Sequence, residues 1–197
     1  MSIFDKISAA AFRAGIRSRT PKSEEWFTSK VKELSMPSRT KLLKDEALEK
    51  RSKVLIGDMV MYFYDPKTKD TLPYYDKFPL TIVVGPAPGG FYGLNLHYVN
   101  PVARARLLNE LFKLAPKNLT NDSRLARLRY DMLQGVKKYK EYEPCFKRYL
   151  MSNVKSQMSR VPMTDWETAI YLPIQQFKKK SSRSVWADSR RVYQGGK

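Results

Sequence analysis

The chain has 197 residues, of which 42% are hydrophobic and 12% aromatic, so it can bury a core of its own and is not disordered throughout. It carries 37 Lys and Arg against 19 Asp and Glu, and this net charge of +18 implies that it meets a polyanion or an acidic protein surface. One Cys and one His exclude an intramolecular disulfide framework and a four-ligand zinc site, and we expect no metal and no other cofactor.

Charge divides the chain into segments. Net charge is +6 over residues 1–53, −1 over 54–100 and +13 over 101–197. A nearly neutral island rich in Gly, Pro and Tyr thus stands between two basic arms. We expect a basic helical N-terminal arm (1–53), a small β-barrel-like core (54–100), a helical region packed on that core (101–177) and a basic tail (178–197).

The N-terminal arm shows helical periodicity. Apolar residues recur at helical spacing in two runs, one before Pro21 and one that ends before Pro37: Ile3, Phe4, Ile7, Ala11 and Phe12, then Trp26, Phe27, Val31 and Leu34. Such stripes are typical of amphipathic helices that pack on a domain core or on a partner. The stripes are short, and no apolar run in the chain reaches 18 residues, so we expect no membrane partner and no transmembrane helix.

The neutral island predicts short strands. Runs rich in strand formers cover residues 54–63, 80–84 and 91–99, while 65–70 has the composition of a turn and 85–90 that of a tight loop. Short strands joined by tight turns are typical of an SH3-like β-barrel or a strongly twisted sheet. With helices on either side, the fold class is α+β.

The C-terminal half predicts a helical bundle. Helix starts are expected at Pro101, at Asn121 or Asp122, at Pro144, and, for a short last helix, at a capping box over 164–167. Pro116 ends the first of these helices and Pro173 the last. The third would bury Phe146 and Leu150 on one face.

Three runs of the sequence carry a resemblance to a known family. Residues 72–80 read LPYYDKFPL, residues 90–99 read GFYGLNLHYV, and residues 144–150 read PCFKRYL. Over about residues 55–150 the chain resembles small virion proteins of large contractile-tailed bacteriophages, which are often described as DNA end protectors or as structural proteins. The resemblance implies a virion protein assembled in the host cytoplasm, and it supplies no catalytic residue.

Residues that could carry catalysis are few. His97 is the one histidine and could act as a general base beside Asp76, but we interpret it as a structural strand residue that bonds backbone or Asn95. Nothing around Cys145 marks a nucleophile, and the glycine-rich loop 85–90 lacks the Lys-Ser/Thr of a phosphate-binding loop. We therefore expect a protein that is not an enzyme, with a nuclease as the minor alternative.

Basic residues on the presumed outer helix faces and in the tail, interleaved with aromatic residues, suit phosphate contacts and base stacking. The predicted DNA-binding residues are Arg124, Arg127, Lys137, Lys138, Lys147, Arg148, Lys178, Lys179, Lys180, Arg190 and Arg191. We expect a virion protein that binds double-stranded DNA without sequence preference, at a packaged genome end or the head–tail junction, and that contacts other virion proteins. The alternative is a pure assembly component of the tail, baseplate or neck, whose basic arms dock on acidic partner subunits.

Overall fold

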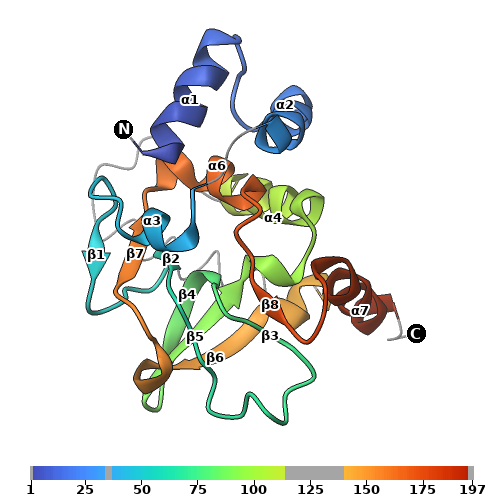
Figure 1. Cartoon of the computed structure of the whole chain (residues 1–197). Helices are drawn as coiled ribbons and strands as arrows, with labels where there is room; N and C mark the ends of the chain where they lie inside the picture. Colours follow the sequence, from blue (N-terminus) through green and yellow to red (C-terminus); the bar gives the residue numbers. More distant parts are fainter. Residues whose placement is uncertain (1, 34–36, 114–139, 195–197) are drawn as a thin grey trace.

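The computed structural model describes residues 2–33, 37–113 and 140–194, with most helices gathered at one end of the molecule and a sheet at the other (Figure 1). The longer helices are α1 (Ile3–Arg13), α2 (Pro21–Glu33), α4 (Pro101–Lys113) and α7 (Ser182–Gln194). Shorter helices and 3₁₀ turns are α3 (Arg39–Leu43), η1 (Leu96–Tyr98), η2 (Lys140–Cys145), η3 (Met151–Asn153), η4 (Met163–Asp165) and α6 (Trp166–Tyr171). Within these ranges no helix has the length and apolar character needed to cross a membrane.

The sheet is antiparallel and draws on distant parts of the chain. Its order is β1-β7-β2-β4-β5-β6. The bounds of these strands are β1 (Lys50–Arg51), β2 (Met59–Met61), β4 (Leu80–Ala87), β5 (Gly90–Asn95), β6 (Phe146–Leu150) and β7 (Met158–Val161). A separate antiparallel pair joins β3 (Tyr75–Asp76) to β8 (Phe177–Lys178). The α+β class is confirmed.

The sheet does not close into the SH3-like barrel that was one of the two expected forms. In the described part of the chain its edge strands β1 and β6 lie at opposite ends of the order and do not pair with each other. The helix predicted from Pro144 is wrong, because Phe146 begins strand β6, which hydrogen-bonds along β5. Apolar residues at positions i and i+4, such as Phe146 and Leu150, share a face in a strand as well as in a helix, so the spacing alone did not separate the two.

Two boundaries in the core also differ from the prediction. The strand expected over 91–99 ends at Asn95, whose side-chain oxygen accepts a hydrogen bond from the His97 backbone N–H at 3.0 Å and starts η1. The loop expected over 85–90 is shorter, because β4 continues to Ala87 and only a two-residue turn precedes β5. Gly89 in that turn has a φ of 70°, a conformation that glycine adopts without strain.

The last segment of the chain is folded onto the rest. The range expected as a basic tail, 178–197, contains helix α7, in which Val185 is fully buried. The Trp186 Nε1–H donates to the carbonyl of His97 at 2.9 Å and fixes α7 beside η1. The helix expected after Asn121 or Asp122 lies outside the described residues.

Apolar packing covers both faces of the sheet. In β2, Met59 and Met61 belong to the larger core cluster, while Val60 belongs to a smaller one, because successive strand residues point to opposite faces. The larger cluster includes residues of α1, α2, α4 and α6. The smaller cluster is largely aromatic and also contains Tyr62, Tyr64, Val83, Phe91, Tyr149 and Met158. Two of its tyrosines, Tyr64 and Tyr149, also line a pocket beside β6.

Gly93 in β5 is a position where no side chain fits. A Cβ there would lie 2.2 Å from Thr81 Cγ2 and 3.3 Å from the Tyr149 ring. We expect Gly93→Ala to lower the free energy of unfolding by about 1–3 kcal/mol, as overpacking of a core does. Gly85→Ala in β4 is the control, because its added Cβ would meet nothing within 4 Å beyond its chain neighbours. Denaturant unfolding that gave both variants the same stability would contradict this packing.

Candidate nucleic-acid interface

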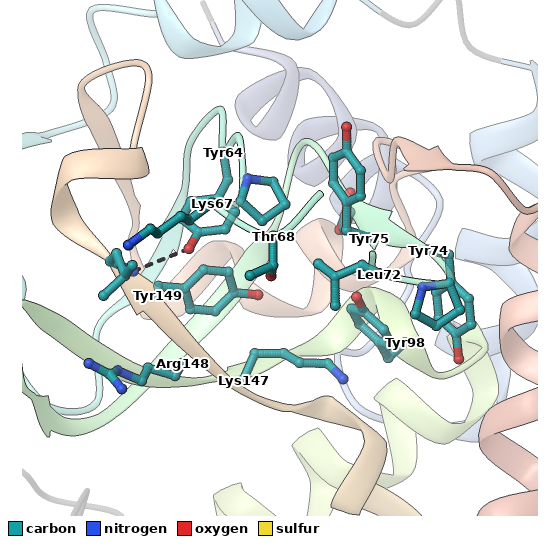
Figure 2. A pocket seen from close by; sticks show the side chains of 14 residues that line it. Tyr64, Lys67, Thr68, Leu72, Tyr74, Tyr75, Tyr98, Lys147, Arg148 and Tyr149 are labelled. Carbon is teal, nitrogen blue, oxygen red and sulfur yellow. Dashed lines mark hydrogen bonds between the residues drawn. The ribbon is translucent and has the colours of Figure 1, made fainter. Parts of the chain in front are cut away.

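A pocket of about 420 Å³ opens between β6 and the loop 66–73, with further walls from β3 and η1. Five of its lining residues are tyrosines, namely Tyr64, Tyr74, Tyr75, Tyr98 and Tyr149, and three are basic, namely Lys67, Lys147 and Arg148. Figure 2 shows Lys147 and Tyr149 extending from β6 into the space beneath the loop, with the Arg148 guanidinium turned away from it. The alternation of a strand explains this, since residues 147 and 149 share one face and residue 148 takes the other.

Lys147 places a positive charge inside the pocket. Its ammonium lies 4.2 Å from the centroid of the Tyr98 ring, a cation–π contact. Burial lowers the pKa of Lys147. No carboxylate of the described ranges forms an ion pair with it. A partly buried cation that has no acidic partner is costly, so this position favours an anionic ligand.

The loop above the pocket is held by the basic run that follows β8. Lys179 has a φ of 70°, and its ammonium donates to three carbonyl groups of the loop at 2.8–2.9 Å, those of Lys69, Asp70 and Leu72. The Nζ of Lys180 lies 4.9 Å from the Tyr74 ring centroid and forms an ion pair with Asp188 at 2.5 Å. The loop is therefore fixed by side-chain bonds to a segment more than 100 residues away in the sequence.

A buried polar network forms the back of the pocket. Asp76 Oδ2 lies 2.6 Å from His97 Nδ1 and accepts a hydrogen bond from the Asn95 amide at 3.3 Å. The same amide group donates to the Tyr149 hydroxyl at 3.1 Å and so sets the position of that ring. Asp76 Oδ1 accepts from the backbone N–H groups of Phe78 and Gln176, both at 3.0 Å. Both carboxylate oxygens are thus bonded inside the protein.

The ionisation of this network follows from its burial. Burial opposes the charge on Asp76, but the His97 ring and the donated hydrogen bonds outweigh it and keep the pKa of Asp76 below its ordinary value. Burial lowers the pKa of His97, with a smaller contribution in the same direction from Arg104, against the pull of Asp76. A neutral imidazole that donates its Nδ1–H to an ionised Asp76 agrees with the lowered pKa of both groups.

Arg104 joins this network to the helices. Its guanidinium is fully buried and donates to the carbonyls of Val99 and Ile170, each at 2.9 Å, and it faces the Trp186 ring at 5.7 Å. Burial lowers the pKa of Arg104 to about 10. The group is a structural clamp between α4, η1 and α6, and it adds to the positive potential near His97.

The residues considered for catalysis lie away from solvent. His97 is fully buried and does not line the pocket; its N–H bonds Asn95, as expected, while its ring bonds Asp76. Cys145 is fully buried as well, and burial raises the pKa of its thiol to about 12, so it is protonated at neutral pH. Among the residues that the structure describes, no group of three His, Cys, Asp or Glu side chains could hold a metal ion.

The residues predicted to bind DNA fall into separate places. Lys147 and Arg148 line the pocket. Lys178, Lys179 and Lys180 do not line it but contact its walls, since Lys178 pairs with Tyr75, Lys179 binds the loop and Lys180 lies over Tyr74. Arg190 and Arg191 are exposed on α7, where Arg190 lines a second hollow of about 340 Å³ with Arg106. The remaining four, Arg124, Arg127, Lys137 and Lys138, lie outside the described residues.

The tyrosines of the pocket were not predicted as binding residues. Tyr74 and Tyr75 lie in the run 72–80 and Tyr98 in the run 90–99, which carry the family resemblance. Aromatic residues beside Lys and Arg are a signal for nucleic-acid contacts, but these two runs contain a single Lys and no Arg, so the signal is absent from them. Tyr64, which forms an isolated bridge with Val154, and Tyr149 of β6 reach the pocket through pairings that the sequence did not reveal.

Comparison with known proteins gives one finding. A family model described as the phage T4 terminal DNA protecting protein matches residues 5–194, nearly the whole chain. Searches of curated proteins and of solved structures give no match. The family expected from the runs at 72–80, 90–99 and 144–150 is confirmed.

His97 makes stability depend on pH in a defined direction. Its pKa in the fold lies below the ordinary 6.5, so the unfolded chain takes up the proton first and stability falls as pH drops below about 6.5. The loss is at most about 1.4 kcal/mol per pH unit. Because His97 is the only histidine, we expect the melting temperature to be lower at about pH 5.5 than at pH 7.5, and His97→Gln to flatten this dependence. A melting temperature that rises on acidification would mean a charged His97 in the fold.

Proposed function

The chain belongs to the family of the phage T4 terminal DNA protecting protein, and from this membership we propose that it binds the ends of a phage genome and shields them without catalysing a reaction. The observation that carries this proposal is the match over residues 5–194 in a chain of net charge +18. Double-stranded DNA is a dense polyanion, and its phosphates neutralise such an excess of Lys and Arg. Binding through phosphates has no sequence preference, which suits a protein that must hold an end of any sequence.

The interior of the protein supports a non-catalytic role. Exonucleolytic attack on DNA needs a positioned water or nucleophile, commonly with metal ions held by clustered carboxylates. The His97 ring is enclosed and bonded to Asp76, and the Cys145 thiol is protonated and enclosed. Protection is then a matter of occupancy, because a protein seated on the end excludes other proteins from the terminal nucleotides.

We place this activity in the virion, at the packaged genome end or at the head–tail junction, where the protein would also contact neighbouring virion proteins. A second role as an assembly component is favoured by apolar side chains on the surface. Phe12 on α1 is 85% exposed, Val102 on α4 is 60% exposed and Val192 on α7 is 53% exposed. Such groups gain nothing from DNA phosphates, whereas a protein partner would bury them.

We expect the purified protein to slow exonuclease digestion of linear duplex DNA and to bind linear DNA better than closed circular DNA of the same sequence. Affinity should fall steeply with salt, with a log–log slope of about −0.9 for each phosphate contacted. Removing the charges of Arg190 and Arg191 on α7 together should make this slope shallower by about 1–2. Filter binding over a salt series and a digestion time course measure these effects.

The matched control removes two exposed charges elsewhere, Lys41→Ala with Lys44→Ala around α3, and should leave the slope unchanged. If linear and circular DNA competed equally well for the protein, it would not recognise DNA ends. A wild-type protein that binds no DNA at low salt would leave only the assembly role, with the basic surfaces docked on acidic subunits.

A further inference from the structure

The size of the tyrosine pocket limits what can enter it. Its volume of about 420 Å³ is within the range of about 300–1,000 Å³ that is typical of small-ligand sites. A side-chain pocket of this size admits one nucleotide, whereas an intact duplex would have to remain outside it. A base can therefore reach the pocket only when it is unpaired and turned out of the stack.

The chemistry of the pocket matches the two parts of a nucleotide. Tyr74 is half-buried and supplies aromatic surface for a base. The neighbouring Tyr98 ring, with its centroid 6.0 Å from that of Tyr74, is 6% exposed and holds the Lys147 ammonium 4.2 Å from its centroid. Lys180, which also lies over the Tyr74 ring, is already paired with Asp188. Phosphate is the anion that accompanies every base in DNA. Aromatic surface next to cations is the combination with which proteins hold unpaired nucleotides.

Lys147 makes an anionic ligand favourable in this pocket. Within the described ranges its ammonium pairs with no carboxylate, and the one acidic group that lines the pocket, Asp76, bonds its oxygens to four internal donors. The pocket therefore presents a cation that no carboxylate of the described residues neutralises. A ligand with both an anionic and an aromatic group would neutralise the charge of Lys147 and pack against the tyrosine rings.

We infer that the pocket receives one unpaired nucleotide from the DNA end, with its base against the tyrosines and its phosphate at Lys147. The inference rests on the proposed end binding and names the part of the end that is recognised. An internal base must be unpaired and unstacked on both sides before it can enter, at a cost of a few kcal/mol. A terminal nucleotide has one stacking neighbour, and an overhanging nucleotide has no pairing partner, so ends fill the pocket more easily than internal DNA.

The test compares three hairpin duplexes of one sequence that differ at their open end. One end is flush, one has a single unpaired 5′ nucleotide and one a single unpaired 3′ nucleotide, with 2-aminopurine as the terminal base and a dumbbell without ends as reference. We expect the wild-type protein to bind at least one overhang about tenfold more tightly than the flush end, within the range for stacking of one base on an aromatic side chain. The emission of that 2-aminopurine should change on binding, because stacking alters it.

Two substitutions address the two halves of the pocket. Lys147→Met keeps the apolar stem and should reduce the overhang preference to about one, while Lys147→Arg should retain it. Tyr74→Leu at a half-buried position should abolish the change in 2-aminopurine emission. Lys41→Met removes one exposed charge on α3 and should leave the overhang preference unchanged. Melting temperatures of all variants establish that they are folded.

The outcomes separate the pocket from end binding itself. Equal affinity for flush and overhanging ends, with weaker binding of the dumbbell, would overturn the pocket and leave the proposed function standing. Equal affinity for the dumbbell and all open ends would overturn both. An overhang preference that survives in folded Lys147→Met and Tyr74→Leu variants would place the unpaired nucleotide elsewhere and would also overturn the inference.

Discussion

The carboxylate of Asp76 is the point on which the rest of the structure depends. It is 3% exposed and accepts hydrogen bonds from four donors in three separate parts of the chain, namely the Phe78 and Gln176 backbones and the Asn95 and His97 side chains. If one of these donors were missing, the buried charge of Asp76 would lower the stability of the fold strongly. The segments that carry the donors must therefore pack together around Asp76. Strand β3, the end of β5, η1 and the segment before β8 are thereby fixed relative to one another.

The pocket follows from this arrangement. Asn95, which bonds Asp76, also donates a hydrogen bond to the Tyr149 hydroxyl and so fixes the position of that ring. Lys179, directly after β8, binds the loop above the pocket. Because the one acidic group of the lining is bonded inward, the ammonium of Lys147 stays without an acidic partner among the described residues. The same feature that stabilises the fold thus leaves positive charge where a DNA end can use it. In the proposed function, the net charge of +18 attracts DNA, and the pocket takes up the nucleotide at its end.

The sequence predicted the local elements better than the site. The strand around Met59 and the strand from Leu80 were predictable because strand formers are bounded there by turn residues. Strand β6 was not, because its apolar residues are spaced as in a helix and its partner strand β5 lies 52 to 60 residues earlier in the chain. The pocket was out of reach for the same reason, since Lys147 meets Tyr98 and Lys179 meets the loop at 69–72 only through tertiary packing.

Photo-cross-linking of an end-labelled duplex tests the central claim most directly. A halogenated uracil as the unpaired terminal base reacts with the side chain it stacks on, and mass spectrometry of the digested adduct identifies that side chain. The account predicts adducts at Tyr74, Tyr98 or Tyr149, in the pocket beneath the loop (Figure 2). Adducts confined to the exposed basic residues of α7, with none in the pocket, would contradict it.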